Sequence, residues 1–167
     1  FQGLKPRYNS LNRLLCQNNV TGCTVMMNRA LIELVRNAPA DKMLMHDWWI
    51  ALAASAFGHI GFVDEPLIKY RQHGSNQLGA VNNRSLKGIA GFIAKSGRAK
   101  ERINATYSQA QSFCSFYKDI LSPESSAVIN AYIDIPSHPK LSRTALLVKN
   151  KFLKQNFMSA AGQLIFC

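Results

Sequence analysis

Three residues that could do chemistry together follow one another in the middle of the chain: Asp47, Trp48 and Trp49. A carboxylate held at the start of a helix can act as a general base, and an indole beside it can form a platform for a sugar ring. Simpler roles are also available. Asp47 could be a helix N-cap, which is worth about 1 kcal/mol, and each tryptophan could be a core residue.

A second polar group follows about twenty residues later, where Tyr70, Arg71 and His73 lie in one short run. The guanidinium of Arg71 has the fork geometry that suits a phosphate, and His73 could bind a metal or a phosphate. A solvated strand end would explain the same residues. A single histidine is weak evidence for a metal site, because such sites take several protein ligands.

The elements that must position these groups follow from the spacing of apolar residues and from capping residues. Helices are predicted for Ser10–Gln17, Arg29–Arg36, Asp47–Phe57, Ser85–Lys95, Ala99–Leu121, a short stretch from Ser122, and Ser142 to the C-terminus. Strands are predicted for Cys23–Met27, Ile60–Val63 and Leu67–Tyr70. The predicted fold class is therefore α+β, mostly α, with a small partial sheet. So few strands leave unpaired edges, which is typical of part of a larger α/β protein.

The composition and charge of the chain limit the classes of partner that it could bind, but they do not select one class. The chain has 167 residues, 47% of them hydrophobic, and a net charge of +11. This is enough for one globular domain, and the charge favours nucleic acid, an anionic membrane surface or a phosphorylated small molecule. No apolar run reaches the roughly 18 residues that suggest a membrane-spanning helix. The four cysteines are far apart and are expected to be reduced and mostly buried, as in a cytosolic protein.

The C-terminal region mixes basic and apolar residues. The set is Arg143, Lys149, Lys151 and Lys154 among Leu146, Leu147, Phe152, Leu153 and Phe157. Such a pattern suits an amphipathic helix packed on a core, and it equally suits a helix lying on an anionic membrane surface.

Several short motifs occur in an order that resembles a known family. They are Thr21–Thr24 with Asn28 and Arg29, His46–Trp49, Asp64–Leu67 and Tyr70–Asn76. Taken in order, they resemble the C-terminal half of family 2 glycosyltransferases, and most closely the bacterial rhamnosyltransferase-like members that build cell-wall or surface polysaccharides. The resemblance covers about Asn18 to Ala80, and beyond Ser85 the chain matches only in being helical.

The resemblance implies a GT-A fold, in which a nucleotide-binding half precedes an acceptor-binding half. By this resemblance Asp47 is the base that deprotonates the acceptor hydroxyl in an inverting transfer. His46, Trp48 and Trp49 would form the acceptor-side wall, and Gly22 the turn before the acceptor strand.

On the donor side, the resemblance places Tyr70, Arg71 and His73 at the diphosphate, with His73 approaching a divalent metal, Mg²⁺ or Mn²⁺. The Asp-x-Asp metal motif and the nucleotide-binding strands of the family are missing from this sequence. We therefore expect a part of a longer transferase, inactive and without bound metal by itself.

The expected division is residues 1–3 as the remnant of a cleaved linker, 4–84 as the acceptor-binding half and 85–167 as a helical region. The expected partners are a nucleotide-sugar donor and a saccharide or lipid-linked acceptor, with no nucleic acid. The expected location is the cytoplasm, with peripheral contact at the inner face of the membrane, and a homo-oligomer is compatible with the sequence. Two alternatives stay open: a non-catalytic basic module that binds nucleic acid or anionic lipid, and a helical scaffold or oligomerisation domain.

Overall fold

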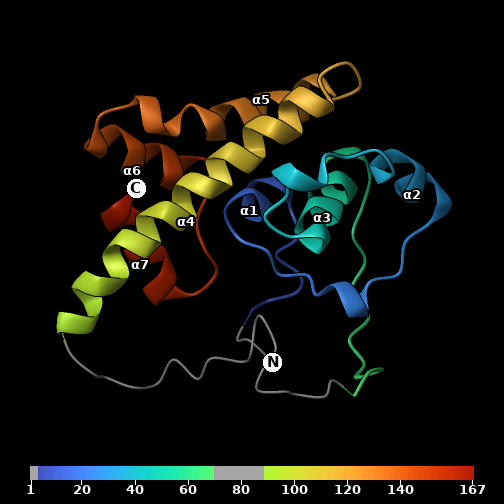
Figure 1. The fold of residues 1–167 in the computed structure, drawn as a ribbon, viewed down its shortest axis with the longest axis horizontal. Helices are drawn as coiled ribbons and strands as arrows, with labels where there is room; N and C mark the ends of the chain where they lie inside the picture. The colour runs from blue at the N-terminus through green and yellow to red at the C-terminus, as the bar shows by residue number, and fades with distance from the viewer. Residues whose placement is uncertain (1–3, 70–88) are drawn as a thin grey trace.

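The protein is mostly helical. The computed structural model describes residues 4–69 and 89–167, without the side chains of residues 89–98 and of Met158. Its α-helices are α1 (Leu11–Cys16), α2 (Arg29–Val35), α3 (His46–Phe57), α4 (Ile89–Phe116), α5 (Pro123–Ile133), α6 (Lys140–Lys149) and α7 (Phe157–Phe166). Three 3₁₀ turns are η1 (Gly22–Thr24), η2 (Ala40–Lys42) and η3 (Ile135–Ser137). Figure 1 shows α4 as a long diagonal, with α1, α2 and α3 on one side of it and α6 on the other.

Local sequence explains where several helices begin. The Asn28 side chain caps α2 by accepting a hydrogen bond from the amide of Leu31 at 2.9 Å. Ser122 caps α5 in the same way, and Pro123 takes the first helical position, where its missing N–H costs nothing. Both caps confirm the predictions from the sequence.

Two helical regions differ from the prediction. The chain forms one continuous helix, α4, where two were predicted, because a single Gly97 costs only about 1 kcal/mol and does not end a helix. The C-terminal region forms two helices, α6 and α7, where one was predicted. Asn150 ends α6 by donating from its side chain to the carbonyl of Leu146, and Lys151 then takes a positive φ of 57°.

The predicted strands do not pair within the described residues. Cys23 lies in η1 and is exposed, although it was expected to be buried. Val25 and Asn28 have extended backbone angles, but residues 25–28 form no strand. Residues 61–69 are exposed and form neither helix nor strand, with a bend at Glu65. A strand needs a second strand to satisfy its backbone groups, and these segments find none among the residues described. All four cysteines are free.

One hydrophobic core joins the N-terminal and C-terminal helices. Trp49 of α3 packs on Phe113 of α4 and on Tyr117, the residue that follows α4, with ring centroids 5.1 and 6.2 Å apart. Helix α1 contacts α3, α4 and α5. A second aromatic group on the same core joins Tyr132 to Phe152 at 5.0 Å. The boundary expected after residue 84 lies outside the described residues, and side chains from both sides of it share this core.

Candidate functional site

Asp47 is a buried carboxylate held by two hydrogen bonds. Only 4% of the residue is exposed. Its Oδ1 accepts from the Nδ2 group of Asn18 at 3.0 Å, and its Oδ2 accepts from the backbone N–H of Gly22 at 3.0 Å. The carboxylate is therefore fixed from the side of the loop that precedes η1.

Asp47 is not the helix N-cap. Helix α3 begins at His46, so that Met45 occupies the cap position without a side-chain cap, and Asp47 is the second residue of the helix. A negative charge in the first turn of a helix is favourable, because the unpaired N–H groups there carry partial positive charge. The alternative that Asp47 merely caps α3 is wrong, because its oxygens bind the loop at Asn18 and Gly22 and not the amides of its own helix.

The loop that holds the carboxylate is itself ordered by short hydrogen bonds. Asn18 accepts from the N–H of Val20 at 3.0 Å through Oδ1, which leaves its amide group to donate to Asp47. Thr24 donates to the carbonyl of Thr21 from its N–H at 2.9 Å and from its hydroxyl at 2.7 Å. These bonds turn the chain so that the N–H of Gly22 points at the carboxylate.

Gly22 and His46 lie against each other. A Cβ atom at Gly22 would stand 2.8 Å from Nε2 of His46 and 3.5 Å from Cβ of Asp47. The first distance is closer than real contacts allow, so the position requires glycine as long as the imidazole keeps its place. His46 is exposed, whereas the next residue, Asp47, is buried. The imidazole of His46 and the side chain of Asp47 therefore both lie next to Gly22.

The two tryptophans belong to the core. Trp48 donates from Nε1 to the carbonyl of Leu14 at 2.6 Å, and only 9% of it is exposed. Trp49 has no exposed surface, and its Nε1 donates to the hydroxyl of Tyr117 at 3.3 Å. The expected acceptor wall of Trp48 and Trp49 is therefore wrong for Trp49, because a ligand cannot touch a residue enclosed by other aromatic rings. The alternative given for each, that of a core residue, describes both.

The carboxylate has capacity left for a ligand. A carboxylate offers about four acceptor positions, and two of those on Asp47 are taken within the described residues. Because both hydrogen bonds come from the loop, they orient the carboxylate and leave its other acceptor positions available to a ligand. This arrangement can accept a hydrogen bond from a hydroxyl, or take its proton.

Asn18 is the site residue that the sequence did not identify. Its place in an Asn-Asn turn predicted a loop, and nothing local indicated that it would meet a side chain 29 positions later. The expected donor-side residues, Tyr70, Arg71 and His73, lie outside the described residues. Within residues 4–69 and 89–167, no group of three His, Cys, Asp or Glu side chains is placed to hold a metal ion.

Two further results concern membrane-spanning helices and similarity to known proteins. None of these helices is both long enough and apolar enough to cross a bilayer. Comparison of the chain with models of known protein families, with curated proteins and with solved structures found no match.

Proposed function

We propose that the chain is the acceptor-binding part of an inverting glycosyltransferase, which moves a sugar from a nucleotide-sugar donor to a saccharide or lipid-linked acceptor. The observation that carries the proposal is the Asp47 carboxylate. It is buried and oriented by Asn18 and Gly22, and the imidazole of the exposed His46 lies against Gly22. Asp47, His46 and Gly22 are also among the residues that the resemblance assigns to the acceptor side, together with Trp48 and Trp49.

The proposed reaction is a single displacement at the anomeric carbon of the donor sugar. A bond forms between the acceptor oxygen and that carbon, while the bond from the carbon to the nucleotide diphosphate breaks. The proton of the acceptor hydroxyl passes to the carboxylate of Asp47. General-base help of this kind is worth about 10²- to 10⁴-fold in rate.

In this proposal Gly22, Asn18 and His46 position the reacting groups and do not react themselves. In this proposal the N–H of Gly22 and the amide of Asn18 hold Asp47 in place for the acceptor hydroxyl, and His46, whose ring lies against Gly22, completes the acceptor side. The resemblance puts the donor diphosphate and a divalent cation, Mg²⁺ or Mn²⁺, near His73. When bound, that cation would stabilise the charge on the leaving diphosphate. In this proposal the enzyme works in the cytoplasm, at the inner face of the membrane.

The test uses the protein together with the coding sequence that lies upstream of Leu4. Release of nucleoside diphosphate is measured over a panel of UDP-, GDP- and dTDP-sugars, with and without Mg²⁺ or Mn²⁺. Asp47→Asn is expected to lower kcat by about 10²- to 10⁴-fold. Asp41→Asn is the matched control, because Asp41 is an exposed acid that pairs only with the neighbouring Lys42 among the described residues.

Two outcomes would contradict the proposal. One is turnover of Asp47→Asn within a few-fold of the Asp41→Asn control, with both variants folded by thermal melting. The other is an upstream sequence that contains neither an Asp-x-Asp motif nor a nucleotide-binding half.

A further inference from the structure

Helix α6 is apolar on its outward face as well as on its inward face. On the inner side Leu147 is completely buried. On the outer side Leu141 is 88% exposed, Val148 is 52% exposed and Ala145 is also exposed. These three residues are spaced four and three apart, so they share one face of the helix. A surface helix normally turns polar residues outward, and packing among the residues that the structure describes does not explain the stripe.

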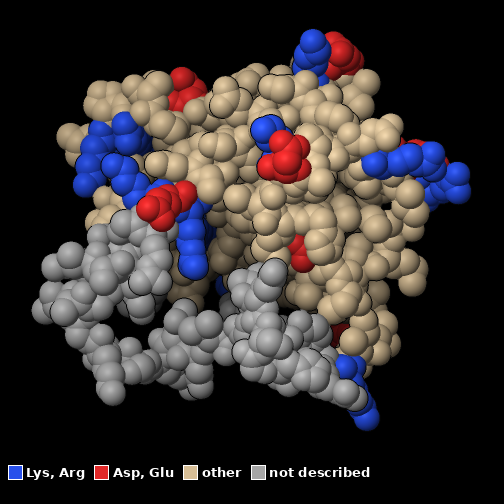
Figure 2. Space-filling view, viewed as in Figure 1, with Lys and Arg blue, Asp and Glu red and all other residues tan. Residues whose placement is uncertain are grey.

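Positive charge surrounds that stripe. Lys140 precedes Leu141, and Lys149 follows Val148. From residue 135 to residue 167 the chain contains five Lys or Arg residues and no Asp or Glu. Figure 2 shows Lys and Arg side chains gathered at the left of the view, where Figure 1 places α6. The surface therefore combines exposed aliphatic groups with a local excess of cations.

A pocket of about 340 Å³ adjoins the same helix. Its polar lining is Lys100 of α4 with Lys140 and Arg143 of α6. Its apolar lining comes from the end of α7, where Ile165 is half exposed. The volume lies at the lower end of the range for small-ligand sites, and suits a phosphate-bearing head group with some apolar surface beside it.

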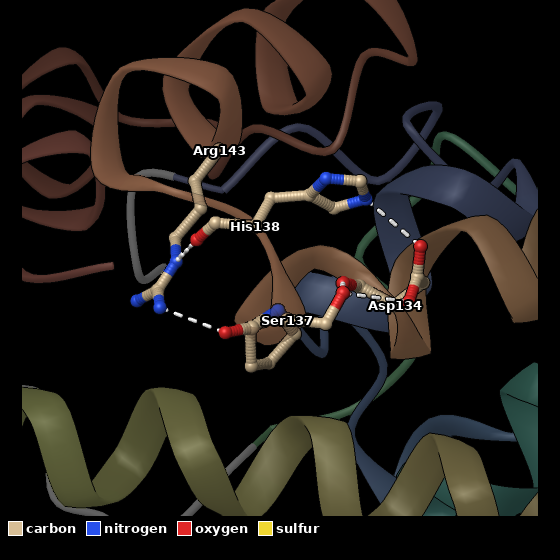
Figure 3. Close-up of polar contacts among 5 residues, drawn as sticks. Asp134, Ser137, His138 and Arg143 are labelled. Carbon is tan, nitrogen blue, oxygen red and sulfur yellow. Dashed lines mark hydrogen bonds and ion pairs between the residues drawn. The ribbon is translucent and has the colours of Figure 1, made fainter.

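The guanidinium of Arg143 is held in place by backbone carbonyl groups. Arg143 donates from Nε to the carbonyl of His138 at 2.6 Å and from Nη2 to the carbonyl of Pro136 at 2.7 Å (Figure 3). A guanidinium has five N–H donors, so these two bonds leave others for an anion. Lys100 and Lys140 are exposed and free to turn toward the same anion.

We propose that this surface binds an anionic phospholipid bilayer peripherally, with a lipid phosphate in the pocket and with Leu141 and Val148 inserted at the headgroup boundary. Cations beside exposed aliphatic side chains on one helix are the features that bind such an interface. The proposal does not depend on the transferase activity, because none of these residues touches the Asp47 site.

Other occupants fit the surface less well. Nucleic acid would use the cations, but aliphatic side chains such as Leu141 and Val148 neither stack on bases nor donate hydrogen bonds. A second copy of the chain placed face to face would bring two positive surfaces together, which is unfavourable. An anionic bilayer uses both the charge and the apolar stripe.

The test measures sedimentation of the purified chain with vesicles of phosphatidylcholine alone and vesicles containing about one third phosphatidylglycerol. We expect binding to the anionic vesicles that weakens as salt is raised. Lys100→Gln with Lys140→Gln should lower the partition coefficient by about fivefold per cation, hence about 25-fold together. Leu141→Ser should lower it by about tenfold.

Each variant has a matched control on another surface. Arg36→Gln with Lys118→Gln removes two exposed cations elsewhere, and Met26→Ser removes an apolar side chain that is 98% exposed near η1. The controls should stay within about twofold of the unmodified chain.

Four results would overturn the proposal. The first is no preference for anionic vesicles, and the second is an equal loss in the controls and in the α6 variants. The third is that Leu141→Ser abolishes self-association of the chain. The fourth is that a DNA duplex binds more tightly than the vesicles, with a steep salt dependence.

Discussion

The contact between Asn18 and Asp47 gives a test of the site that needs no substrate. Replacing Asn18 by alanine removes its 3.0 Å bond to the carboxylate and its 3.0 Å bond from the N–H of Val20. A hydrogen bond to a charged group is worth about 1.5–3 kcal/mol, and a neutral one about 0.5–1.5 kcal/mol. Asn18 is half-buried, so water replaces part of the loss. We expect Asn18→Ala to lower the free energy of unfolding by about 2–3 kcal/mol.

A double-mutant cycle separates the bond from other effects of the substitution. Asn18→Ala, Asp47→Ala and the double variant are unfolded in urea, and the transition is followed by tryptophan fluorescence, which reports on the buried Trp49. Alanine adds no hydrogen-bonding group, so the coupling free energy reports the contact that both variants lose. We expect a coupling of about 1–2 kcal/mol.

The control cycle pairs Asn18→Ala with Asp41→Ala. Asp41 is an exposed carboxylate whose ion pair is with its neighbour Lys42 at 3.0 Å, so the two changes should add within about 0.5 kcal/mol. The reasoning about the site fails if the Asn18–Asp47 cycle is equally additive. In that case the amide would not orient the carboxylate.

Two further changes test the C-terminal half. Gly162 lies inside α7, and a Cβ atom added there would have no neighbouring atom within 4 Å. Gly162→Ala should therefore stabilise the protein by about 0.5–1 kcal/mol and raise Tm in calorimetry. An unchanged or lower Tm would show that this turn of the helix is not formed. The hydrogen bond from Ser137, and to a lesser extent the one from His138, lowers the pKa of Asp134 below its ordinary value of 3.8. The stability that Asp134 contributes is therefore present above pH 3.8 and is lost as the pH falls further. Asp134→Asn should therefore lower the urea midpoint near neutral pH, and the difference from the unmodified chain should shrink below pH 3.8; a constant difference would contradict the assignment.

The sequence predicted best those features that depend on near neighbours. Leu14 and Leu15 identified the buried face of α1, and Asn28 and Ser122 identified two helix starts, because capping and helical periodicity act over three or four residues. The hydrogen bond from Asn18 to Asp47 could not be predicted in this way. It joins residues 29 positions apart and depends on how the loop folds back on α3.

The predicted strands show a feature that the local sequence pattern does not determine. Apolar and β-branched residues in Cys23–Met27 and Ile60–Val63 predicted strands, but Cys23 lies in a 3₁₀ turn and neither segment forms a strand in the described structure. Whether an extended segment becomes a strand depends on a partner, and the pattern of a segment does not say which partner it will meet. The small sheet therefore stays a prediction.

Helix α4 supports the candidate site through its contact with the indole of Trp49. The carboxylate of Asp47 keeps its direction only if α3 cannot turn about its own axis. The next two residues prevent that turn, because Trp48 donates to the carbonyl of Leu14 and Trp49 packs on Phe113 of α4 and on Tyr117, which follows α4. An aromatic residue of this size removes roughly 150–250 Å² from water, worth a few kcal/mol at about 25 cal/mol per Å². Without α4 that surface would be exposed, and the constraint on α3 would weaken with it. The helical region is thus part of the scaffold that positions the carboxylate.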